Sequence, residues 1–147
     1  MNTFLKENFF KLLIGSSILI LSIGVLIYIV TATQTPPSAN DKIIGEPIKI
    51  GNLEVAQFDI PKYMNRNDAS SACKALGSGW RLPNRNELHL LHKNKDKIGG
   101  FSPEWYVSRS VIWKDESQLA CFIDFETGRV VYMRGIYDAN VRAVRTF

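Results

Sequence analysis

The sequence predicts an α+β domain that follows one membrane-spanning helix. Three observations support this prediction. An uncharged apolar run occupies residues 12–30, helix-type segments follow between residues 67 and 97, and most of the later runs are rich in aromatic and β-branched residues. Helices early and strands late favour two helices packed with an antiparallel sheet.

The uncharged run at residues 12–30 has the length of a membrane span. At the helical rise it covers about 28 Å, close to the bilayer core of about 30 Å. It is longer than the apolar core of a cleavable signal peptide, about 7–15 residues. We therefore predict an uncleaved signal anchor whose partner is the lipid bilayer, although the small residues at 30–32 also suit cleavage.

The charges beside this run predict its orientation. Lys6 and Lys11, offset by Glu7, lie on the short side, so residues 1–11 are expected in the cytoplasm. The rest is expected outside the cytoplasmic (inner) membrane, in the periplasm or at the cell surface. Residues 31–44 begin with the polar, proline-bearing stretch TATQTPPSAN and are predicted to be a linker, and residues 45–147 the folded domain.

The first elements of the domain follow from short apolar runs and capping residues. Strands are expected at Ile48–Ile50 and Val55–Ile60. A helix is expected at Asn67–Leu76, capped by Asn67 or Asp68 and stopped at Gly77.

A second helix start lies in the segment GWRLPNRNELHLL, residues 79–91. Pro83 halts the preceding chain, Asn84 can cap the helix, and the Glu87 carboxylate can reach back to the cap. Leu88 and Leu91 then share one face. The motif is structural and comprises Trp80, Arg81, Leu82, Pro83 and Glu87.

Later strands are expected in five runs, with a turn at Thr127–Gly128. The runs are Trp105–Val107, Val111–Trp113, Leu119–Phe125, Arg129–Arg134 and Asn140–Arg145. The three tryptophans, Trp80, Trp105 and Trp113, are predicted to lie in the core. Salt bridges are predicted for Arg81, Arg142 and Arg145.

Four segments occur in a fixed order: GWRLPNRNELHLL, EWYVSRS, ACFIDFETGRVV and NVRAVR. Together they resemble the Lcl C-terminal domain-like family of bacterial envelope proteins, over residues 65–146. The resemblance implies a C-type-lectin-like α+β fold and a binding or adhesive surface in place of an active site. The chain departs from the family at Ala143, where members carry a late cysteine.

Cys73 and Cys121 are the only two cysteines. In an exported domain they are expected to form a disulfide, worth about 4 kcal/mol in the chain-entropy model. The alternative is two separate buried thiols. The family resemblance implies a late cysteine as the partner of Cys73, but this chain has Ala143 at that position. Cys121 is then the only cysteine that can pair with Cys73.

No set of residues indicates catalysis, so we predict a protein that is not an enzyme, with no cofactor and no metal. His89 and His92 are spaced to share one helix face, but the sequence offers no third metal ligand at a suitable spacing. We therefore expect both histidines to lie on a solvated helix face. The net charge of +4 is spread along the chain and gives no indication that the protein binds nucleic acid.

Two clusters are candidate ligand contacts. One is the basic run Lys93, Lys95 and Lys97; the other comprises Tyr132, Arg134, Tyr137, Asp138 and Asn140. The sequence predicts a membrane-anchored extracytoplasmic module that recognises a protein or envelope glycan. The alternative is a structural accessory subunit of an envelope or secretion assembly. The oligomeric state stays open.

Overall fold

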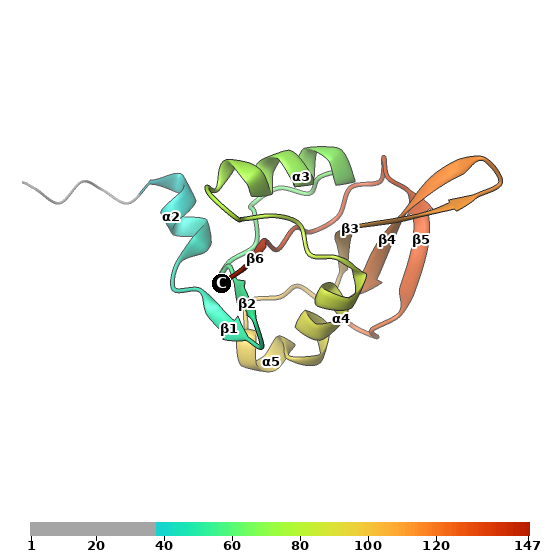
Figure 1. Cartoon of the computed structure of the whole chain (residues 1–147). Helices are drawn as coiled ribbons and strands as arrows, with labels where there is room; N and C mark the ends of the chain where they lie inside the picture. Colours follow the sequence, from blue (N-terminus) through green and yellow to red (C-terminus); the bar gives the residue numbers. More distant parts are fainter. Residues whose placement is uncertain (1–37) are drawn as a thin grey trace, which may run out of the picture. The chain divides into compact units, whose positions relative to one another are not determined.

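The computed structural model describes residues 38–147 (Figure 1). The predicted cytoplasmic segment, residues 1–11, and the predicted membrane anchor, residues 12–30, lie outside the described residues. Within residues 38–147, every helix falls short of the length and apolar character that a membrane span requires.

The described chain forms four helices and six strands. In chain order they are α2 (Ala39–Ile44), β1 (Ile48–Ile50), β2 (Leu53–Val55), α3 (Arg66–Ala75), α4 (Arg85–Lys93), α5 (Lys95–Ile98), β3 (Trp105–Lys114), β4 (Ser117–Asp124), β5 (Val130–Arg134) and β6 (Val144–Thr146).

The strands form two antiparallel sheets, ordered β1-β2-β6 and β3-β4-β5. The first sheet joins the two ends of the domain, because Glu54 of β2 lies opposite Arg145 of β6. In the second sheet β3 and β4 form a long hairpin that projects from the body (Figure 1). The predicted α+β class is confirmed, with two sheets in place of the one expected.

Strand β4 is covered on both faces, since its residues 120–123 are all buried. Phe122 packs in a cluster with Cys73 of α3, whereas Ile123 packs in a second cluster with Leu88 and Leu91 of α4. The alternation of side chains along a strand therefore divides the core into two parts, one under α3 and one under α4.

The start of α4 has the predicted capping box. The Asn84 side chain accepts from the Glu87 N–H at 2.9 Å, and the Glu87 carboxylate accepts from the Asn84 N–H at 2.7 Å. Arg81 donates to both Glu87 oxygens, at 2.7 and 2.9 Å. Burial by itself raises the pKa of Glu87, but these hydrogen bonds and the Arg81 charge lower it overall.

The predicted ion pairs of Arg142 and Arg145 are also present, with Asp59 and Glu54. The Arg145 guanidinium lies 4.9 Å from the centre of the Trp80 ring. The segment around Trp80 is thereby tied to the β2–β6 sheet.

Several element boundaries differ from the sequence prediction. Helix α3 is capped by Asn65, whose side chain accepts from the N–H groups of Asn67 and Asp68. The two runs expected between residues 105 and 113 form one strand, β3, interrupted by a register shift between Val107 and Val111. The described part of the predicted linker forms α2, whose Ile43 and Ile44 pack against the core.

The predicted disulfide is wrong in this structure, because both thiols are free and buried. Cys73 packs beside Phe122 on the α3 side of β4. Cys121 precedes Phe122 in the strand, so its side chain points to the opposite face. Burial raises the pKa of the Cys73 thiol to about 12.

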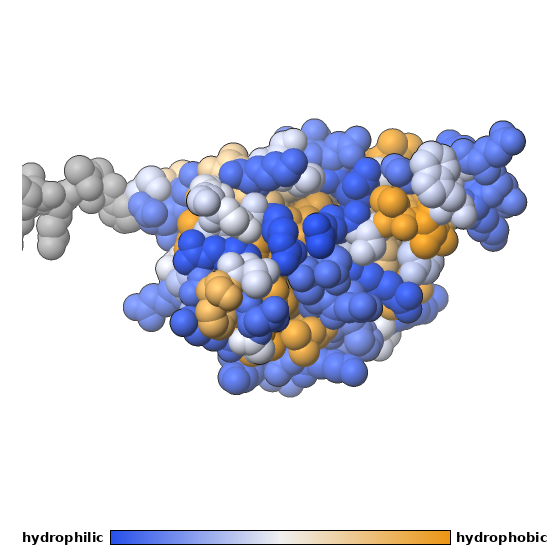
Figure 2. Space-filling view, viewed as in Figure 1, coloured by the Kyte–Doolittle hydropathy of each residue, from blue (hydrophilic) through white to orange (hydrophobic). Residues whose placement is uncertain are grey.

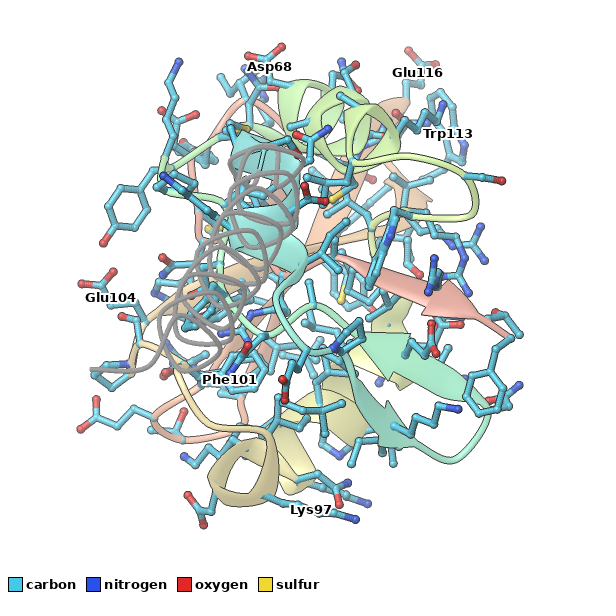
Figure 3. All side chains as sticks on the ribbon, turned by 90° about the vertical axis from the view of Figure 1, so that its left-hand side faces the viewer. Asp68, Lys97, Phe101, Glu104, Trp113 and Glu116 are labelled. Carbon is cyan, nitrogen blue, oxygen red and sulfur yellow. The ribbon has the colours of Figure 1, made fainter. Side chains whose placement is uncertain are left out.

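The prediction that all three tryptophans are core residues is wrong for one of them. Trp80 is 3% exposed and Trp105 is half-buried, but Trp113 is 71% exposed. Trp113 lies near the tip of the β3–β4 hairpin, beyond the helices that cover the rest of the sheet, and Figure 3 shows it beside Glu116 at the periphery.

Candidate ligand-binding face

A recess of about 300 Å³ opens between the start of α4 and the outer part of the β3-β4-β5 sheet. Tyr132 and Ile112 lie on one face of this sheet, because they pair with Cys121 and Leu119, which are two residues apart on β4. The recess is lined by Asn84, Arg85, Asn86, Ser110, Val111, Ile112 and Tyr132.

The wall of the recess is fixed by contacts between β3 and α4. The Ser110 hydroxyl accepts from the Arg85 N–H at 2.9 Å, and the Arg109 N–H donates to the Pro83 carbonyl at 2.9 Å. These contacts lie in the part of β3 where the register shifts. Irregularities of this kind redirect side chains and often border binding sites. The rigid capping box of α4 and the bulged strand thus define the recess together.

The recess presents polar groups that no described residue uses. The side chains of Arg85 and Asn86 are exposed and make no hydrogen bond or ion pair within residues 38–147, and the Tyr132 hydroxyl likewise has no partner there. An aromatic ring, an amide and a guanidinium can together contact a sugar face, a hydroxyl and a carboxylate.

Exposed apolar side chains lie on the projecting hairpin and in the loop after β5. Ile112 is 38% exposed, Ile136 is 72% exposed and Tyr137 is 53% exposed. Figure 2 shows apolar surface beside the base of the hairpin. We call the recess and Arg134, which pairs with Leu119 and so lies on the same face as Tyr132, the sheet face. Exposed aromatic and arginine residues are frequent anchors of protein interfaces.

The structure separates the predicted late cluster into two groups. Tyr132 and Arg134 lie on β5, and Tyr137 and Asp138 are exposed in the loop that follows. Asn140 is half-buried, and its side chain donates to the Trp105 carbonyl at 3.3 Å. Its backbone also pairs with β3, so its contacts are those of a structural residue.

The three lysines of the predicted basic run differ in their surroundings. Lys93 and Lys97 are exposed, but the Lys95 ammonium donates to the Phe125 carbonyl at 2.6 Å. Lys97 lies at the opposite end of the domain from Trp113 (Figure 3).

His89 and His92 are half-buried, contrary to the solvated face that their spacing predicts. His92 packs edge-on against Phe125, with 5.4 Å between ring centres. Burial and the Lys95 charge lower the pKa of His92. Within the described residues, no three histidine, cysteine or acidic side chains gather as metal ligands would.

Sequence reasoning missed Arg85, Asn86 and Ile112 as surface candidates. Arg85 and Asn86 occupy the first turn of a helix whose other face is buried, which is a usual place for solvated residues. Only the bulge that brings β3 beside this turn makes them part of a recess.

The comparisons with known proteins support the fold. A crystal structure of botrocetin, a C-type-lectin-like protein, matches 78% of this chain and 100% of its own, with a TM-score of 0.52 and 9% sequence identity. No family model matches the chain, and no curated protein matches it significantly. The described domain thus has a C-type-lectin-like fold, as the sequence resemblance implies.

Proposed function

We propose that this protein is a non-catalytic binding module that recognises a protein or an envelope glycan through the sheet face. The observation that carries the proposal is the recess between α4 and β3, where Arg85, Asn86 and Tyr132 present polar groups free of partners within the described chain. The likeness to botrocetin supports a fold that serves binding.

The cellular setting is part of the proposal. The uncharged run at residues 12–30 and the lysines before it favour an anchor in the cytoplasmic membrane, with the domain outside. Membership of the Lcl C-terminal domain-like family is proposed on the order of the four sequence segments. Both free thiols are compatible with this location, because each is buried in the core.

Binding can be tested with the full-length chain in detergent micelles. The protein is applied to an array of glycans and anionic polymers, with calcium or chelator, at two salt concentrations. Binding that persists at moderate salt, with or without calcium, is expected. The Arg85→Ala and Arg134→Ala variants should each weaken it about tenfold or more, the loss typical of an interface anchor.

The control variant is Lys97→Ala, which removes an exposed charge at the far end of the domain (Figure 3). It should bind as the unchanged protein does. Binding that disappears at moderate salt, or that falls equally in all three variants, would reduce the effect to general charge attraction. No binding to any ligand would favour the alternative, a structural subunit, which cross-linking of the full-length protein in its membrane would detect.

A further inference from the structure

Strand β5 forms an open edge of the β3-β4-β5 sheet (Figure 1). Among the described residues, β4 is the only strand hydrogen-bonded to it. A strand at an edge presents a row of backbone N–H and C=O groups, and these groups can pair with another extended chain.

The registers identify which groups of β5 point outward. The two-residue turn at Asp115 and Glu116, both with positive φ, makes Lys114 and Ser117 the hydrogen-bonded pair that closes the hairpin. Odd-numbered residues of β4 therefore bond toward β3, and even-numbered residues bond toward β5. Two further backbone hydrogen bonds agree with this alternation. The Phe125 N–H donates to the Glu104 carbonyl, and the Asp124 N–H donates to the Arg129 carbonyl.

It follows that Val131 and Met133 bond to β4, because they lie opposite Phe122 and Ala120. The backbone groups of Val130 and Tyr132 then point away from the sheet, and no described residue bonds to them. The Arg134 N–H also points outward, while its carbonyl accepts from the Tyr137 N–H at 3.3 Å. The edge thus offers five unpaired backbone groups.

The sequence of this edge lacks the usual protection. Exposed edges are commonly blocked by proline, by a bulge or by inward-pointing charges. Strand β5 reads VVYMR, with no proline, and its pairing with β4 shows no register shift. β-Branched and aromatic residues are the ones that favour strand pairing.

The charges at the two ends of the edge indicate the occupant. Arg129 precedes β5 and Arg134 ends it; both are exposed, and neither forms an ion pair with a described residue. Asp124 lies near Arg129, but its carboxylate already accepts from Thr127 and from the Glu126 N–H. Each end of the edge therefore carries an arginine that forms no ion pair among the described residues.

A second copy of this chain is a poor occupant of the edge. Antiparallel pairing of two β5 strands about Tyr132 would bring four arginines to one short seam, with no carboxylate contributed by β5. Like charges brought together across strands are destabilising. An extended segment with acidic residues at both ends complements the same edge.

We propose that β5 binds an extended, acid-flanked peptide segment of a partner protein as a fourth strand of the β3-β4-β5 sheet. The backbone of Val130, Tyr132 and Arg134 supplies the hydrogen bonds, and Arg129 and Arg134 contact the flanking carboxylates. This inference rests on the proposed function as a binding module, and it names the class of partner.

Amide hydrogen exchange of the full-length chain, resolved by residue, tests the inference. In the free protein the amides of Val131 and Met133 should exchange slowly, and those of Val130 and Tyr132 rapidly. The probe is a synthetic peptide of alternating valine and threonine with two glutamates at each end. At saturation it should slow the Val130 and Tyr132 amides about tenfold or more and leave the Val131 and Met133 amides little changed.

Two control peptides separate backbone pairing from charge attraction. The same peptide with its central amides N-methylated should give no protection, because it cannot form the ladder. A version flanked by lysines should bind more weakly. Protection of Val130 and Tyr132 that rises with protein concentration in the absence of peptide would overturn the inference in favour of pairing between two copies.

Substitutions at the edge complete the test. Val130→Pro removes an outward N–H and spares the bonds to β4, so the sheet should survive and peptide binding should be lost. Val130→Ala keeps the N–H and is the matched control. No protection by millimolar peptide, or equal binding to both variants, would overturn the inference.

The two proposals fail separately. Arg85→Ala should weaken recess binding about tenfold or more and leave the peptide-induced protection unchanged. Val130→Pro should abolish that protection and leave recess binding unchanged. Loss of edge binding alone would leave the recess intact as a ligand site.

Discussion

Arg142, a residue 1% exposed, is paired with Asp59, which also accepts a hydrogen bond from the Tyr106 hydroxyl. The remaining guanidinium donors reach backbone carbonyls, including that of Gly100 at 2.7 Å. The Phe101 ring centre lies 4.0 Å from the guanidinium carbon. This one side chain therefore holds the loop after β2 against the loop after α5.

Removal of either partner of this pair should destabilise the domain strongly. Asp59→Ala leaves the buried Arg142 charge uncompensated, which costs about 3–5 kcal/mol in comparable buried pairs. Denaturant unfolding of the variant and the unchanged protein gives the difference. The matched control is Asp96→Ala, an exposed acidic residue in α5, for which a change within about 0.5 kcal/mol is expected. Equal effects would mean that the pair contributes little.

Glu87→Gln should lower stability by about 1–3 kcal/mol, because it weakens both the capping box and the bidentate contact with Arg81. The pKa of Glu87 is lowered from its ordinary value of 4.5, so its contribution is complete above that value and is lost as pH falls through the lower folded-state pKa. Unfolding measured from pH 7 to pH 2 should show a smaller difference between variant and unchanged protein at acid pH. A constant difference would contradict this account.

The two thiols should be inert in the folded protein. Burial raises the pKa of both Cys73 and Cys121, so little thiolate is present at neutral pH. A thiol reagent should therefore label neither cysteine until denaturant is added, and then label both. A reducing agent should leave the melting temperature unchanged; a fall on reduction would instead reveal a disulfide.

The tryptophans should differ sharply in their effect on stability. Trp80→Ala removes a buried ring and should cost about 3–5 kcal/mol. Trp113→Ala removes an exposed ring and should change stability by about 0.5 kcal/mol or less. Thermal melts of both variants provide the comparison. A large loss for Trp113→Ala would show that the hairpin tip is packed, contrary to its exposure.

Local signals in the sequence predicted a substantial part of this fold. Asn84, Glu87 and the apolar spacing of Leu88 and Leu91 specify α4 from contacts three or four residues apart, and the structure confirms each of them. The turn at Thr127–Gly128 is likewise local, with Gly128 at φ +76°. Short-range hydrogen bonds and helical spacing can be read from the chain because they involve near neighbours.

Only the tertiary structure decided which surfaces are available. The Cys73 and Cys121 thiols lie on opposite faces of β4, and Trp113 lies beyond the helices that cover the sheet. Both facts depend on how distant elements pack. The recess at Arg85 exists because a bulge in β3 meets the start of α4, and the free edge exists because β5 is the last strand of its sheet. Composition and spacing set local conformation, whereas burial and open edges depend on contacts between residues far apart in the chain.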